Sequence, residues 1–101
     1  MITLMATLKA KKGQEDALEA AMVQLVKQVE AEDGTLEYVL NRSTTDPASF
    51  MVFEVYKDND ALTHHASTDY FKAAMKESAA FLESKPGMEF YTEVIRINRQ
   101  P

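Results

Sequence analysis

The 101-residue chain contains no cysteine, and this absence excludes several chemistries at once. Without a thiol there is no disulfide, no thiolate nucleophile and no cysteine-ligated metal centre. A chain without cysteine is compatible with a reducing compartment. The N-terminal sequence MITLMATLKAKKG has neither the basic lead of a signal peptide nor the length of a membrane span, so the expected location is the cytoplasm.

Glycine and basic residues are also scarce. The three glycines are isolated from one another, so no glycine-rich loop is present to bind phosphates. Eleven basic residues against sixteen acidic ones give a net charge of −5, which argues against nucleic acid because phosphate binding requires clustered Lys and Arg. No serine lies in a recognisable nucleophile elbow. We therefore expect one domain over residues 1–101 that binds neither nucleic acid nor membrane.

The chain does contain a clear order of strand and helix patterns. Four segments show the two-residue alternation of a β-strand, namely residues 2–8, 36–42, 50–56 and 89–97. Two segments show the three- and four-residue spacing of an amphipathic helix: residues 14–32, and residues 58–82 with a restart at Ser67-Thr68-Asp69. The order β-α-β-β-α-β predicts an α+β, ferredoxin-like fold with a four-stranded antiparallel sheet.

The strands of this predicted sheet are apolar on both faces. In the third strand Phe50 and Val52 point one way, and Met51, Phe53 and Val55 point the other. Two helices cover only one face, so the second face remains as an apolar association surface. We therefore expect a symmetric homodimer packed sheet to sheet.

Residues 50–75 bring together both histidines of the chain and an acid in an apolar strand. His65 shares a helix face with Ala61 and Leu62 and is expected to point inward, whereas His64, about 100° round the helix, should face solvent. An inward imidazole can accept a proton, donate one or hold a polar substrate atom. The alternative is a core histidine bonded to a carbonyl or a carboxylate.

Glu54 stands in the middle of a strand made otherwise of Phe, Met, Val and Tyr, where a charge is costly without a partner. Three interpretations are open: it orients His65, it acts as a base with a raised pKa, or it pairs with Arg42 or Arg96 on neighbouring strands. Tyr56, two residues on, shares its face and either adds a hydroxyl to the same cavity or packs at the sheet edge.

The sequence offers little for a metal ion or a cofactor. Adjacent histidines on a helix diverge, and the positions four residues before and after His65 hold Ala61 and Asp69. Asp69 is expected to cap the next helical segment. We therefore expect no metal and no cofactor.

The segment that carries these residues resembles the antibiotic biosynthesis monooxygenase family. The family pattern reads roughly Glu-x-aromatic-x-[Asp/Ser]-x-x-Ala-Leu-x-x-His-x-x-[Ser/Thr]-x-x-Phe. Eight residues fall on it: Glu54, Tyr56, Asp58, Ala61, Leu62, His65, Thr68 and Phe71. The Lys-Lys-Gly turn after the first strand and the Glu-Asp-Gly-x-Leu-x-Tyr sequence of residues 32–38 also resemble the family. The resemblance covers nearly the whole chain.

This resemblance implies a dimeric α+β barrel with a cavity between the sheet and the helices of each subunit. Members of the family include cofactor-independent oxygenases of polycyclic phenols and quinols, haem-degrading enzymes, and an isomerase of a phosphorylated signalling sugar. The haem branch has an asparagine in the first strand, a tryptophan at the position of His65 and a histidine at that of Met75. This chain lacks all three, so we reject haem degradation. The phenol oxygenases often carry tryptophan where Tyr56 stands.

The function expected from the residues and the resemblance together is a cofactor-free monooxygenase that uses dioxygen on a small phenolic or quinol substrate. His65, helped by Glu54, would remove or bind the proton of the substrate hydroxyl. Tyr56, Tyr70 and Phe71 are the expected walls of the substrate site.

Two alternatives remain open at this point. One is an isomerase that uses the same pair as a proton shuttle, with Lys72 or Arg96 contributing charge for a phosphate. The other is a non-catalytic dimer that binds a small aromatic ligand.

Overall fold

The computed structural model describes residues 1–99 and contains the predicted order of elements. The strands are β1 (Ile2–Lys9), β2 (Thr35–Arg42), β3 (Ser49–Tyr56) and β4 (Gly87–Thr92). The helices are α1 (Glu15–Val29), α2 (Asn59–Ser67) and α3 (Asp69–Ser78), followed by the short 3₁₀ turn η1 (Ala79–Phe81). Neighbouring strands are antiparallel in the order β2-β3-β1-β4, which confirms the ferredoxin-like βαββαβ sheet.

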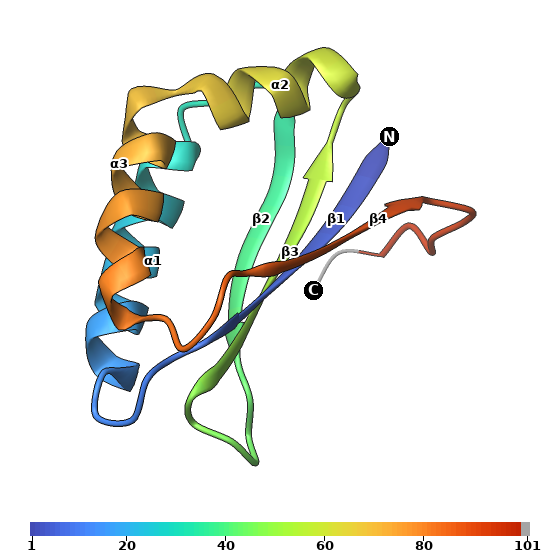
Figure 1. The fold of residues 1–101 in the computed structure, drawn as a ribbon. Helices are drawn as coiled ribbons and strands as arrows, with labels where there is room; N and C mark the ends of the chain where they lie inside the picture. Colours follow the sequence, from blue (N-terminus) through green and yellow to red (C-terminus); the bar gives the residue numbers. More distant parts are fainter. Residues whose placement is uncertain (100–101) are drawn as a thin grey trace.

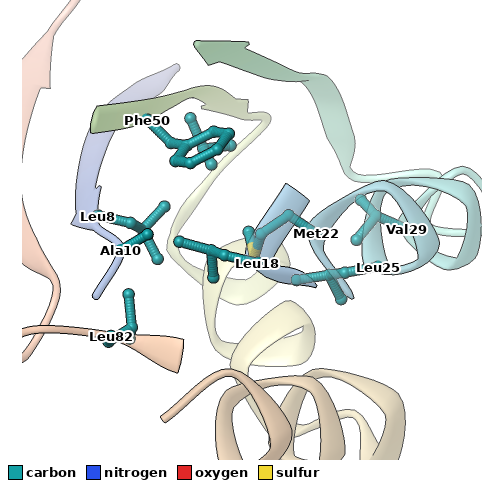
Figure 2. Packing of buried hydrophobic residues seen from close by; sticks show 9 residues of the cluster. Leu8, Ala10, Leu18, Met22, Leu25, Val29, Phe50 and Leu82 are labelled. Carbon is teal, nitrogen blue, oxygen red and sulfur yellow. The ribbon is translucent and has the colours of Figure 1, made fainter. Parts of the chain in front are cut away.

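The helices lie on one face of the sheet (Figure 1). The buried hydrophobic core lies between these two layers. Leu18, Met22 and Leu25 recur along α1 at helical spacing and pack toward Leu8 of β1 and Phe50 of β3 (Figure 2). All five are buried, and each contributes roughly 1.5–3 kcal/mol relative to an exposed position. This packing holds α1 against the centre of the sheet.

Two side-chain caps set the course of the chain after β3. Asp58 accepts a hydrogen bond from the backbone N–H of Ala61 at 2.9 Å and begins α2. Thr68 accepts one from Phe71 N–H at 3.3 Å and donates its hydroxyl to the carbonyl of His65 at 2.8 Å. Thr68 therefore ends α2 and begins α3, so the restart lies within the predicted Ser67-Thr68-Asp69 sequence, but the expectation that Asp69 is the cap is wrong.

The ends of α1 and β4 differ from the predictions. Helix α1 ends at Val29, so the turn before β2 begins earlier than the expected residue 32. Strand β4 ends at Thr92, and the predicted continuation to Ile97 is wrong. The reason is the register: Thr92 pairs with Ile2, the first residue of β1, so no neighbouring strand remains beyond it.

After β4 the chain crosses the face of the sheet opposite the helices. Arg96 reaches Glu37 on β2, the strand at the other edge, with 2.8 Å between Nη2 and Oε2. Glu37, Val55, Thr3 and Tyr91 form one row across the sheet, and Val55 and Thr3 in its middle are buried (0% and 8% exposed). The segment thus covers one row of this face.

The longest helix of residues 1–99 is α1, with 15 residues. None of the described helices has the length and apolar character needed to cross a bilayer.

Candidate functional site

A cavity of about 580 Å³ lies between the helix-facing side of the sheet and the helices. One row of the sheet lines it, because the register places Tyr38, Glu54, Leu4 and Phe90 side by side. Apart from Tyr38, Glu54, His65 and Lys85, the described residues that line it are apolar. A cavity of this volume and character suits a small organic ligand held by a few polar contacts.

His65 lines this cavity from α2 and is almost completely buried, whereas His64 is exposed, as the helical spacing predicted. Three aromatic rings surround the imidazole. The ring centroids of Phe71, Tyr38 and Tyr56 lie 4.7, 5.1 and 5.4 Å from that of His65, all in tilted arrangements. These contacts restrict the orientation of the imidazole.

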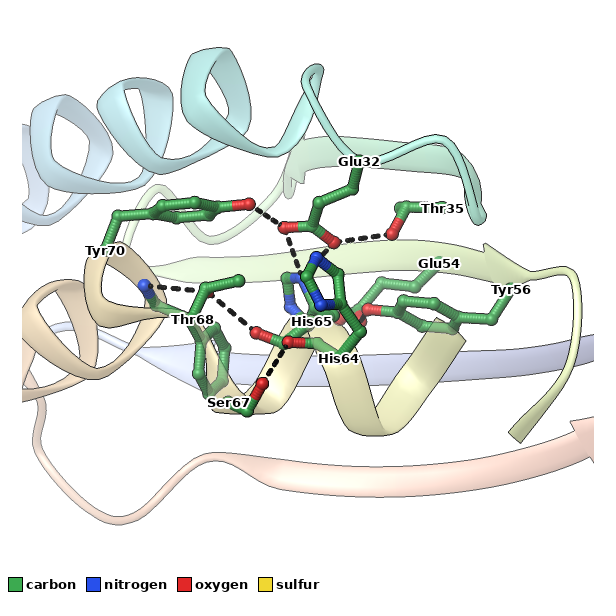
Figure 3. Close-up of polar contacts among 10 residues, drawn as sticks. Glu32, Thr35, Glu54, Tyr56, His64, His65, Ser67, Thr68 and Tyr70 are labelled. Carbon is green, nitrogen blue, oxygen red and sulfur yellow. Dashed lines mark hydrogen bonds and ion pairs between the residues drawn. The ribbon is translucent and has the colours of Figure 1, made fainter. Parts of the chain in front are cut away.

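The carboxylate partner of His65 is Glu32, from the turn between α1 and β2. His65 Nδ1 lies 3.0 and 3.2 Å from the two carboxylate oxygens (Figure 3). Glu32 also accepts hydrogen bonds from the Thr35 hydroxyl, at 2.7 Å, and from the Tyr70 hydroxyl. Of the three interpretations of Glu54, the one in which it orients the imidazole is therefore wrong: that contact is made by Glu32, an acid 33 residues earlier in the chain than His65.

This contact determines which nitrogen of His65 carries the proton. A carboxylate only accepts hydrogen bonds, so Nδ1 holds the proton and Nε2 keeps a lone pair. Within residues 1–99, Nε2 is buried and has no hydrogen-bond partner. His65, whose side chain lines the cavity, therefore keeps an unused hydrogen-bond acceptor.

The charges of the pair follow from burial and hydrogen bonding. Burial lowers the pKa of His65, and the nearby Glu32 carboxylate only partly offsets this. Burial raises the pKa of Glu32, but the hydrogen bonds from Tyr70, Thr35 and His65 outweigh it and leave the pKa below its ordinary value. At neutral pH the pair is a carboxylate beside a neutral imidazole.

Glu54 lines the cavity from β3 and is buried. Within the described residues its carboxyl accepts one side-chain hydrogen bond, from the Tyr56 hydroxyl to Oε1 at 2.5 Å. Burial raises the pKa of Glu54 to about 7, and the negative charge of Glu32 adds to this, while the bond from Tyr56 opposes it. Glu54 is thus poised between its two protonation states near neutrality.

The pairing of this buried acid with Arg42 or Arg96 is wrong. Arg42 binds two acids of α1, with its guanidinium over the ring of Phe50. Arg96 binds Glu37 and Glu93. Both arginines therefore neutralise surface carboxylates instead of the one in the cavity.

The structure brings His65, Glu54 and Phe71 to one cavity. Tyr56 and Tyr70, the other expected walls, lie behind the lining, because their hydroxyls bind the carboxyls of Glu54 and Glu32. The two tyrosines therefore contact acids of the site. Among residues 1–99, no group of three or more His, Asp or Glu side chains is arranged to hold a metal ion.

Sequence reasoning missed Glu32 and Tyr38. Glu32 follows the C-terminal end of α1, where the helix dipole disfavours a negative charge, so an acid at this position requires a specific partner. It also opens the Glu-Asp-Gly-x-Leu-x-Tyr sequence that ends at Tyr38. The Glu-Asp-Gly-x-Leu-x-Tyr sequence was therefore the feature from which both Glu32 and Tyr38 could have been identified as site residues.

Comparisons with known proteins agree with this fold. The family model for antibiotic biosynthesis monooxygenases matches residues 1–77. A Caulobacter crescentus structure described as a candidate antibiotic biosynthesis monooxygenase is 36% identical, with a TM-score of 0.88 over 93% of this chain and 90% of that one. A Pseudomonas aeruginosa structure is 30% identical, with a TM-score of 0.87 over 93% and 94% of the two chains.

An uncharacterized protein of Synechocystis sp. is 24% identical over 90 residues. The alignment covers 89% of this chain, and the chain spans 61% of the length of that relative. Because the family model matches most of the described chain, the protein belongs to the antibiotic biosynthesis monooxygenase family.

Proposed function

We propose that the protein is a cofactor-independent monooxygenase that oxidises a small phenolic or quinol substrate with dioxygen. The observation that carries the proposal is the buried His65, whose Nδ1 is held by Glu32 while Nε2 has no partner in residues 1–99. A neutral imidazole held in this way accepts the proton of a substrate hydroxyl at Nε2.

Glu32 supports this proton transfer without taking part in it. When Nε2 accepts a proton, the imidazolium forms next to an existing carboxylate, which stabilises the new positive charge. Hydrogen bonds from Thr35 and Tyr70 hold the carboxylate in place. His65 is therefore the group that contacts the substrate, and Glu32 is a positioning residue.

The apolar lining supports the reaction with dioxygen. A phenolate in this cavity loses most of its hydration, which makes it a stronger electron donor to dioxygen. The rings of Phe71 and Tyr38 offer surfaces for an aromatic substrate. The substrate then supplies the electrons that a flavin or a metal supplies in other oxygenases.

The isomerase alternative receives less support from the same cavity. Lys72 and Arg96, the expected phosphate partners, do not line it, and Lys85 is the one cation among the described residues that do. A phosphate would share the cavity with the acid Glu54 and a largely apolar wall, which disfavours a doubly charged ligand.

Oxygen uptake tests the proposal directly. Chelator-treated, flavin-free protein is incubated with reduced naphthoquinol and anthrone-type phenols, and ¹⁸O₂ labelling follows one oxygen atom into product and one into water. We expect His65→Asn to lower kcat/KM roughly 10²–10⁴-fold. His64→Asn, the exposed neighbour on the same helix, should match the wild type.

Each other outcome has a definite meaning. Equal rates for His65→Asn and wild type would remove His65 from the chemistry. Saturable binding without turnover would identify a binding protein, and turnover of a phosphorylated metabolite without oxygen uptake would identify an isomerase.

A further inference from the structure

The cavity contains a second group that can carry a proton, Glu54, which has no part in the removal of the substrate proton by His65. Glu54 lies at the centre of the sheet, paired in register with Tyr38 on β2 and Leu4 on β1. His65 approaches from α2 in the helical layer (Figure 3). The carboxyl of Glu54 and the imidazole of His65 therefore line the same cavity, one from the sheet and the other from the helical layer.

The hydrogen bond from Tyr56 determines where Glu54 can carry a proton. Tyr56 is fully buried, and burial together with the adjacent Glu54 carboxyl raises the pKa of its phenol, so the hydroxyl keeps its proton and donates it. Oε1 is therefore an acceptor. A proton on Glu54 sits on Oε2, the oxygen for which the described residues supply no side-chain donor.

The surroundings of Glu54 keep this proton available near neutral pH. The titratable groups that face the cavity come from β2, α2 and the segment before β4: Tyr38, His65 and Lys85. Burial, with a contribution from Glu32, raises the pKa of Glu54 to about 7, so the carboxyl can both hold and release a proton near neutral pH. The neighbouring lining from β1 and α3, including Leu4, Phe71 and Met75, carries no charge.

We propose that Glu54 is a proton donor in the oxygenation, and that Tyr56 is the positioning residue that places the donated proton on Oε2. This inference rests on the proposed function.

After His65 has removed the phenol proton, one electron passes from the phenolate to dioxygen, and the two radicals combine at a ring carbon to give a peroxide anion. The Oε2–H bond of Glu54 breaks and an O–H bond forms at the terminal peroxide oxygen.

The remaining protons balance within the same cavity. The Glu54 carboxylate removes the hydrogen on the peroxide-bearing carbon, a C=O bond forms there, and the O–O bond breaks. The departing hydroxide takes the proton from the His65 imidazolium. The sum is phenol plus O₂ to quinone plus water, and both residues return to their starting states. Two protons are delivered and two are removed, and each residue makes one transfer in each direction.

The test compares Glu54→Gln and Tyr56→Phe with the wild type in oxygen uptake. Glutamine keeps the size of Glu54 and still accepts the bond from Tyr56, but it cannot release a proton. We expect kcat to fall roughly 100-fold with KM nearly unchanged. The wild-type kcat should decline above about pH 7, and this decline should be absent in Glu54→Gln.

Tyr56→Phe removes the bond that favours the ionised form of Glu54, so the decline should move to higher pH. We expect kcat to fall about tenfold, because the proton is no longer restricted to Oε2.

Glu89→Gln is the matched control: Tyr91 donates to Glu89 at 2.5 Å in the same Glu-x-Tyr arrangement, but on exposed β4. It should keep wild-type rates.

Carbon-13 titration of the glutamate carboxyls provides a readout independent of turnover, with the Glu54 signal assigned by its loss in Glu54→Gln. A Glu54 signal that titrates in the ordinary glutamate range would overturn the proposal. So would an unchanged kcat in Glu54→Gln, or a rise in KM alone, which would indicate substrate binding without proton donation. If the wild type itself consumes no oxygen, the proposed function fails and this step fails with it.

Discussion

At the scale of single residues, the cavity separates two buried carboxyls into different protonation states. Glu32 accepts hydrogen bonds from three side chains, Thr35, His65 and Tyr70, and stays ionised. Glu54 accepts one, from Tyr56, and holds its proton to about neutral pH. The number of hydrogen-bond donors thus keeps Glu32 ionised, where it supports the base His65, and leaves Glu54 able to donate a proton.

The first prediction concerns the tautomer of His65. In Glu32→Gln an amide N–H can face Nδ1, so the imidazole proton moves to Nε2, which then no longer accepts a proton from the substrate. We expect kcat/KM to fall roughly 10³–10⁴-fold. Nitrogen-15 NMR of the imidazole should show the change of tautomer. Glu30→Gln, the exposed acid two residues earlier, should change neither readout, and an unaltered tautomer in Glu32→Gln would contradict the assignment.

The second prediction concerns the pH dependence of stability. The pKa of Glu54 rises from 4.5 to about 7 on folding, so its stabilising contribution is complete below pH 4.5 and is lost as the pH rises through 7. Relative to Glu54→Gln, the wild type should lose about 3 kcal/mol of unfolding free energy between pH 4 and pH 8. Urea denaturation at a series of pH values measures this. Parallel curves for the two proteins would contradict the raised pKa.

Residue-scale features were predictable where they depend on local periodicity. The inward His65, the exposed His64 and the costly position of Glu54 follow from helix and strand spacing alone. The Glu32–His65 contact was not predictable in this way, because it joins residues 33 positions apart through the way α2 docks beside the start of β2.

At the scale of elements, the docking of α2 depends on a position without a side chain. A Cβ at Gly34 would lie 2.6 Å from the Cβ of Ala61, so only glycine permits this approach. The Gly34 carbonyl also accepts the backbone N–H of Lys57, at 2.9 Å, just before α2. This close contact brings Glu32 within reach of His65.

The third prediction follows from this contact. Gly34→Ala should push α2 away from β2, lower the unfolding free energy by about 1–3 kcal/mol and weaken the Glu32–His65 bond. Activity should fall with it. Adding Ala61→Gly removes the clashing methyl group and should restore activity, although glycine in the helix costs about 1 kcal/mol. Strictly additive effects of the two changes in a double-mutant cycle would contradict a direct contact.

Element boundaries were predictable to different degrees. The restart of the helix at Ser67-Thr68-Asp69 was predictable, because caps such as Thr68 are local interactions of side chains with the next turn. The end of β4 was not predictable from its own alternating residues. It depends on Ile2, where β1 begins, and no pattern within residues 89–97 contains that information.

At the scale of the whole molecule, the sheet has one face covered by helices and one largely open. The row Val39–Phe53–Met5 lies in the middle of the open face, and the segment after β4 covers the adjacent row. That segment itself exposes Val94, Ile95 and Ile97. Apolar surface of this kind is typical of an association site. We propose that a second copy of the chain packs on it, sheet to sheet.

The fourth prediction tests this dimer through Val39, which is 45% exposed in the single chain. Because the side chain already faces solvent, Val39→Lys should change the stability of a monomer by at most about 0.5 kcal/mol. In a sheet-to-sheet dimer the same change buries a charge without a partner, which costs several kcal/mol per interface. Sedimentation at micromolar concentration should therefore show a dimer for the wild type and a folded monomer for Val39→Lys. Val23→Lys, at a 39% exposed valine on α1, should remain dimeric. A monomeric wild type would contradict the proposal, and so would a Val39→Lys variant that sediments as a dimer.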